Sequence, residues 1–164
     1  MKNMILLLLT VGLMASGAVQ AASLPDIKLE QTVVKMPLQE GVTMSDAVDS
    51  MKLRANRHNM NLVAELPLSR QVEAMGKKAR RMEIFQFCDA LTAQRMVEAN
   101  INFAAYLPCR IALVEDEKGQ GWLVMMNLDM MLNGATLTEE LKAEATRVRD
   151  ALMDIMQAGA EGAL

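Results

Sequence analysis

The sequence predicts an α+β domain with a single, mostly antiparallel sheet and helices packed on one face of it. Strand-like and helix-like segments interleave in the order β-α-β-(α)-β-α-β-β-α. One clear hairpin joins two consecutive strands around Lys118, and a long amphipathic segment closes the chain. The hairpin requires antiparallel neighbours, and helices mixed with such a sheet are typical of the α+β class.

The first 21 residues have the layout of a secretory signal peptide. Lys2 gives a positive start, an apolar run follows from Met4, and Val19 and Ala21 fit the −3 and −1 positions of a cleavage site. The apolar run is short for a membrane span, which needs about 20 residues. We therefore expect a periplasmic or secreted protein with no membrane segment after cleavage, a linker over residues 22–30 and one domain over 31–164.

The first half of the domain supplies two strands around a helix. Residues 31–38 read as a strand. Thr43 and Asp46 then have the spacing of a capping box, with Asp in place of the usual Glu or Gln. Apolar residues at steps of four, three and four predict an amphipathic helix over 44–57. Residues 62–66 form the second strand, which Pro67 ends.

The middle of the chain predicts a short helix or ordered loop over residues 69–79 and a third strand over 81–88. Asp89 can cap a helix that runs to about Asn100, and a loop follows over 101–108. The hairpin then consists of strands 109–115 and 121–128 around a turn at 117–120.

The closing helix has the strongest periodicity. Thr136 and Glu139 have the spacing of a second capping box, and Gly159 is expected to end the helix. Between them the apolar face repeats at steps of four and three, through Leu141, Ala145, Val148, Leu152 and Ile155.

Two cysteine-containing stretches resemble a known family. Phe87-Cys88 with the helix after it, Leu107-Pro108-Cys109-Arg110, and the hairpin are similar to the domain of unknown function family 302, a group of small bacterial proteins. The resemblance covers residues 31–157 and implies an α+β fold, but the family has no settled biochemistry. Members often have Asn-Pro after the first cysteine, where this chain has Asp89-Ala90.

The cysteines are the residues best suited to chemistry, and the strand directions decide whether they meet. If the two flanking strands are parallel, the thiols lie about 26 Å apart, whereas a disulfide needs Cα atoms within about 7 Å. If the strands are antiparallel, Cys88 and Cys109 converge with Phe103 and Tyr106 into one pocket, with Arg110 near its rim. A disulfide, a reactive or metal-binding dithiol, and two inert core residues all remain open.

Other residue types are less specific. Met126 with Met130, and Met153 with Met156, have spacings seen in copper sites, yet methionine also fills cores that are poor in aromatic residues. His58 reads as a surface residue and the basic run over 77–81 as a solvated loop. The acidic run over 115–117 lacks the spaced ligands of a calcium loop.

Composition and motifs narrow the function classes. A formal net charge of −3 and 3% aromatic residues give no reason to expect nucleic acid. No hydrolase, P-loop or dinucleotide motif is present, so we assign no catalytic residue and no cofactor. We expect a non-enzymatic binding or accessory module for a small ligand or a periplasmic protein, with a homodimer as a further option. The alternative is a thiol-based redox or soft-metal handling protein that uses Cys88 and Cys109.

Overall fold

The computed structural model describes residues 27–163, which form one antiparallel five-stranded sheet with helices, as the sequence predicted. The predicted signal peptide and most of the linker lie outside the described residues. The strand order across the sheet is β1-β5-β4-β3-β2, and every neighbouring pair is antiparallel. The strands are β1 (Val33–Pro37), β2 (Asn61–Leu66), β3 (Met82–Cys88), β4 (Cys109–Glu115) and β5 (Gly121–Met126).

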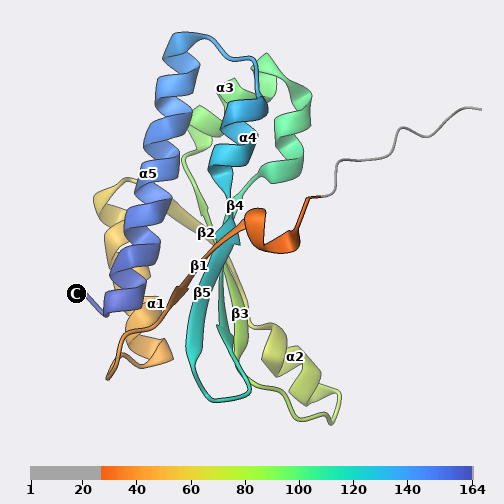
Figure 1. Ribbon diagram of the computed structural model, residues 1–164, viewed down its shortest axis with the longest axis vertical. Coiled ribbons are helices and arrows are strands. Elements are labelled where there is room, and N and C mark those ends of the chain that lie inside the picture. The colour runs from red at the N-terminus through yellow and green to blue at the C-terminus, as the bar shows by residue number, and fades with distance from the viewer. Residues whose placement is uncertain (1–26, 164) are drawn as a thin grey trace, which may run out of the picture.

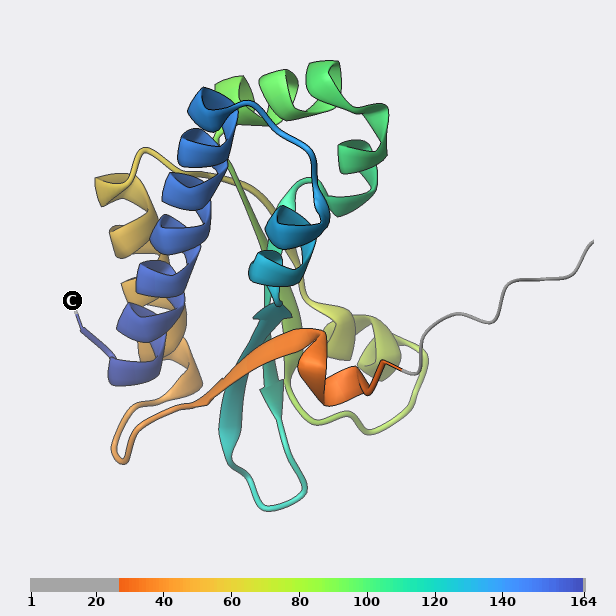
Figure 2. The same cartoon turned by 45° about the horizontal axis from the view of Figure 1, so that its top comes forward.

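Two long helices lie side by side across one face of the sheet, and the shorter ones surround its ends (Figures 1 and 2). The long pair is α1 (Met44–Arg57) and α5 (Glu139–Glu161). The shorter helices are α2 (Leu68–Ala74), α3 (Ala90–Ala99) and α4 (Leu128–Gly134), with the 3₁₀ segments η1 (Leu29–Gln31) and η2 (Ile101–Tyr106). Among the helices of residues 27–163, none combines the length and apolar character needed to cross a bilayer.

The main core lies between the sheet and the long helices. Alternate residues of the central strands are fully buried there, as Phe85, Ile111 and Leu123 show, and they pack with residues of α5 such as Leu152 and Ile155. Because successive side chains of a strand point to opposite faces, the residues between them belong to the other face. Those residues are mostly half-buried, so this second face is left comparatively open.

The closing helix differs at both ends from the prediction. Its N-cap is Thr138, whose hydroxyl accepts a hydrogen bond from the backbone N–H of Leu141, so the capping box predicted at Thr136 was wrong. The helix also continues through Gly159 and ends before Gly162, which has a φ of 64°. A left-handed cap favours glycine, which explains the later end.

Helix α4 (Leu128–Gly134) was not anticipated, because the predicted strand ran on to residue 128 and no element was predicted for residues 129–135. Strand β5 ends at Met126, and the side chain of Asn127 then accepts a hydrogen bond from the backbone N–H of Asp129. This cap begins a helix at once. The predicted loop over 101–108 likewise contains η2, which Asn100 caps through the N–H of Asn102.

Candidate functional site

The strand register settles which arrangement of the cysteines holds. Strands β3 and β4 are antiparallel, and Phe87 lies opposite Cys109. Cys88 is the next residue along β3, so the two cysteines lie at the same end of the sheet. Both are nevertheless free thiols. By the alternation of the pleat, Cys109 shares the face of Phe87 and Cys88 belongs to the opposite face, which explains why neighbouring strands leave them unbonded.

Both thiols are held in the neutral form. Burial, together with the nearby Cys88, raises the pKa of Cys109 to about 11, although Arg110 acts in the opposite direction. Burial also raises the pKa of Cys88, as does the charge of Asp89. Since the thiolate is the form that attacks disulfides and binds metals, neither sulfur is activated at neutral pH.

A small inner cavity of about 50 Å³ lies beside the two cysteines. Four of the five predicted site residues line it, namely Cys88, Phe103, Tyr106 and Cys109. Most of the remaining lining is apolar and comes from α3, α4 and α5, with Met96, Met131 and Ala145 as examples. The structure thus brings these four residues together around one cavity, while their use as a ligand site stays a prediction.

Arg110, the fifth predicted residue, does not line this cavity. It follows Cys109 on β4, and adjacent residues of a strand point to opposite faces. Arg110 is exposed and lines a larger groove of about 590 Å³ instead.

The larger groove runs along the open face of the sheet, at the end where β5 gives way to α4. Its floor includes residues that point away from the long helices, namely Ile84, Ala112 and Val124. Its sides include Met130 and Met131 of α4, and Thr32 and Val33 at the start of β1. No sequence motif marks this groove, because its lining comes from segments spread over about 120 residues. Of the patterns noted in the sequence, the spacing of Met126 and Met130 was the one that pointed to residues of this groove.

Among residues 27–163, Arg110 is the single charged residue that lines the groove, and this lining contains no aspartate or glutamate. Arg110 also makes no ion pair with any residue in the described part of the chain, and its partner across the ladder is the neutral Gln86. The groove thus combines an apolar surface with one unneutralised positive charge.

The methionine pairs fall in different surroundings. Met126 and Met130 are about 40% exposed and line the groove, whereas Met156 is fully buried in the core and Met153 is half-buried against it. The pair in α5 therefore fills the core. Within residues 27–163 no group of three or more His, Cys, Asp or Glu side chains could hold a metal ion.

His58 has a partner that the sequence did not reveal. Its Nε2 lies 2.6 Å from Oδ2 of Asp154, and Nη1 of Arg54 lies 2.5 Å from the other oxygen. These hydrogen bonds, that of His58 first, lower the pKa of the Asp154 carboxyl. The cluster joins α1 to α5 at the surface, 96 residues apart in sequence for the His58–Asp154 pair.

The basic run over 77–81 and the acidic run over 115–117 make ion pairs and hydrogen bonds near the start of β3 and the turn between β4 and β5. Arg81 forms an ion pair with Glu83 at 3.0 Å, and Arg80 lies 4.0 Å from Glu117. Asp116 accepts hydrogen bonds from the indole N–H of Trp122 and from backbone N–H groups of the turn, and these bonds, that of Trp122 first, lower the pKa of its carboxyl. These contacts give both runs a structural role.

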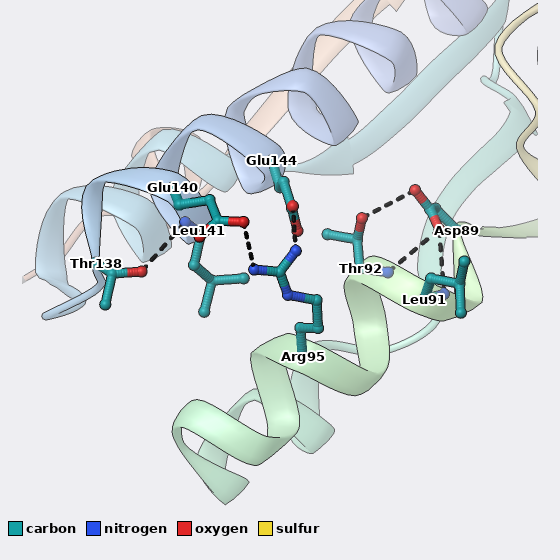
Figure 3. Close-up of polar contacts among 8 residues, drawn as sticks. All are labelled: Asp89, Leu91, Thr92, Arg95, Thr138, Glu140, Leu141 and Glu144. Carbon is teal, nitrogen blue, oxygen red and sulfur yellow. Dashed lines mark hydrogen bonds and ion pairs between the residues drawn. The ribbon is translucent and has the colours of Figure 1, made fainter.

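Helix α3 and η2 form an arch over the inner cavity, beyond the ends of the strands (Figure 2). Asp89 caps α3 by accepting hydrogen bonds from the backbone N–H groups of Leu91 and Thr92, and the hydroxyl of Thr92 donates another at 2.9 Å (Figure 3). Arg95 then bridges to α5, with Nη2 3.0 Å from Oε1 of Glu140 and Nη1 on Glu144.

Comparison with known proteins identifies the family but no activity. The model of the family described as "Domain of unknown function DUF302" matches residues 34–159. A solved structure, "uncharacterized conserved protein DUF302 from Bacillus stearothermophilus", has a TM-score of 0.63 and 16% sequence identity, with 77% of this chain and 97% of that one covered. That likeness shows a shared fold, and no curated protein matches the chain. Since the family model spans most of the domain, the chain belongs to the DUF302 family.

Proposed function

We propose that this protein is an exported, non-enzymatic binding module that holds a small amphipathic anion in the groove on the open face of its sheet. The apolar part of the ligand would lie on Ile84, Val124 and Met130, and its anionic group would lie on Arg110. The signal-peptide pattern of residues 1–21 supports export.

One observation carries the proposal: a groove of about 590 Å³ is apolar over most of its lining, and the described part of the chain gives it one charged side chain, that of Arg110, with no carboxylate partner there. Small-molecule sites are typically concave, about 300–1,000 Å³ in volume and mainly apolar, with a few polar groups that orient the ligand. Arginine suits this orienting role because its guanidinium can donate two parallel hydrogen bonds to a carboxylate or phosphate. A single-headed anion with an apolar body matches both features.

Thiol-based redox exchange or soft-metal binding by Cys88 and Cys109 receives less support. Burial raises the pKa of both thiols, so the reactive thiolate is scarce at neutral pH. The thioethers of Met126 and Met130 lie in the groove, but the proposed ligand already accounts for their position as flexible apolar lining.

The test uses the full mature protein and an environment-sensitive fluorescent fatty acid, 11-(dansylamino)undecanoic acid. Titration should show saturable binding with a blue-shifted emission, because the dansyl group moves from water to an apolar surface. Arg110→Gln should weaken binding about tenfold, since a hydrogen bond to a charged group contributes about 1.5–3 kcal/mol and Arg110 is exposed.

Arg147→Gln is the matched control, because Arg147 is exposed on α5 and lines neither cavity. It should bind the probe like the wild type. Equal loss in the two variants would indicate a general charge effect and contradict a role for the groove. A tight dimer without probe binding, seen by sedimentation velocity, would mean that a second copy covers this face and would also contradict the proposal.

A further inference from the structure

The groove and the inner cavity are separated by one layer of side chains. Tyr106, Cys109, Leu128 and Met131 line both of them. These residues come from η2, β4 and α4, which lie at the same end of the sheet as α3 (Figures 1 and 2). A shift of this thin wall would join the two spaces.

The most adaptable residue of the wall is Met131. Its side chain is half-buried, and its unbranched thioether, with three rotatable bonds, adapts its shape more readily than the branched Leu128 or the aromatic Tyr106. Met131 also packs against both hydrophobic clusters of the protein, the main core and a smaller one beneath α3. It is therefore placed as a gate between the groove and the cavity.

The inner cavity suits an apolar guest. It holds about 50 Å³, and most of its lining is apolar. Its polar lining groups include the two neutral thiols, the hydroxyl of Thr92 and the carboxylate of Asp89, which accepts a hydrogen bond from that hydroxyl. A cavity lined mainly by apolar groups stays dry and accepts apolar molecules.

The arch of α3 and η2, which forms the roof of the cavity, packs into a hydrophobic cluster separate from the main core. Met96 of α3 and Phe103 of η2 belong to the smaller cluster, with Leu132, Leu141 and Ala145. Charged contacts across the roof are those of Arg95 with Glu140 and Glu144, drawn in Figure 3, and they are at the surface. The roof can thus adjust to a guest without disturbing the core under α1.

We propose that the inner cavity is the end pocket of the groove and receives the terminal carbons of the ligand's apolar tail, so that the protein selects anionic amphiphiles by chain length. This proposal rests on the proposed function, because it needs the anionic head on Arg110. Its consequence is specific: the affinity should depend on chain length through residues that do not line the groove itself.

Ala93 offers the test, since it lines the inner cavity from α3 and does not line the groove. Saturated fatty acids of 8 to 18 carbons would compete with the dansyl probe, each below its aggregation concentration. In the wild type the affinity should rise about fourfold for each added methylene until the cavity is filled. Ala93→Leu fills the cavity from within, so its affinities should level off at a shorter chain while the shortest acids bind as in the wild type.

Ala143→Leu is the control, because Ala143 is exposed on α5 and lines neither space. It should reproduce the wild-type series. Ala93→Val, which adds less volume, should give an intermediate limit and keeps the test available if Ala93→Leu does not fold.

The outcomes separate the two proposals. If the probe and all fatty acids fail to bind the wild type, the proposed function fails. If they bind but the folded Ala93 variants follow the same chain-length dependence as the wild type, the end pocket is refuted and the groove is left as the whole site.

Discussion

Gly159 offers a test of how closely α5 packs on the domain. It is a buried glycine within α5, and an added Cβ would lie 2.6 Å from Cγ of Met51 and 2.9 Å from Cδ1 of Leu123. The same Cβ would lie 3.2 Å from the backbone oxygen of Ala47. Met51 can yield, but the Ala47 oxygen is part of the backbone of α1. The two helices would therefore have to separate slightly.

Two opposing effects set the magnitude for Gly159→Ala. Alanine is favoured over glycine inside a helix by about 0.8–1.0 kcal/mol. Overpacking a close-packed core typically costs about 1–3 kcal/mol. Because three buried groups crowd the added methyl, we expect an overpacking cost in the upper part of this range, about 2–3 kcal/mol. Less the helix propensity gain, the net loss of unfolding free energy is about 1–2 kcal/mol.

Urea denaturation followed by circular dichroism measures this effect. With a slope of about 2 kcal/mol per M, in the middle of the range typical of urea, the midpoint should fall by roughly 0.5–1 M. Gly134→Ala is the control, because Gly134 ends α4 and a Cβ there meets nothing within 4 Å. It should leave the midpoint unchanged or raise it. A Gly159→Ala protein as stable as the wild type would refute the close contact between α5 and α1.

Two further predictions concern the start and the surface of α5. Thr138→Ala should cost about 1 kcal/mol, because it removes the hydroxyl that caps the N–H of Leu141, whereas Thr136→Ala should cost less than about 0.5 kcal/mol. Equal losses in urea titrations would contradict the assigned cap. The folded-state pKa of Asp154 is lowered, so its stabilising contribution is complete above the unfolded pKa of about 3.9 and is lost as the pH falls through the lower folded value. The urea midpoints of the wild type and Asp154→Asn should differ at pH 7 and converge near pH 2; an undiminished difference at low pH would show that another property of the side chain is responsible.

The sequence was informative wherever structure depends on neighbours along the chain. The box of Thr43 and Asp46 forms as predicted, with the hydroxyl accepting from the N–H of Asp46 and the carboxylate accepting from Thr43. This capping box depends only on two residues three positions apart, so the sequence alone is enough to predict it. The end of α5 could not be found in this way, because Gly159 reads as a helix end in isolation. Its role depends on Met51 and Leu123, which tertiary packing brings against it.

The same distinction applies to the candidate site: the sequence indicated the cysteine cavity but not the groove. The convergence of Cys88 with Cys109 followed from one alternative, the antiparallel pairing of two strands, and the register bears that alternative out. The groove had no such signal, since it also needs an unpredicted helix, α4, and the residues before β1. Its lining can be recognised only when the sheet order places β1 beside β5.

The position of Arg110 relative to Cys109 follows from the sequence itself. In a strand, adjacent residues point to opposite faces, so the side chains of Cys109 and Arg110 leave β4 on different sides. Cys88 also lies on the face opposite Cys109, but it is the last residue of β3 and still lines the cavity. The same alternation gives the end of β4 two roles. Cys109 contributes to the wall between the groove and the inner cavity, while Arg110 supplies the charge on the open face. A single dipeptide thus lies where the anionic head and the apolar tail of the proposed ligand would both be held, and for this reason an amphipathic anion explains the site better than a metal ion at the thiols.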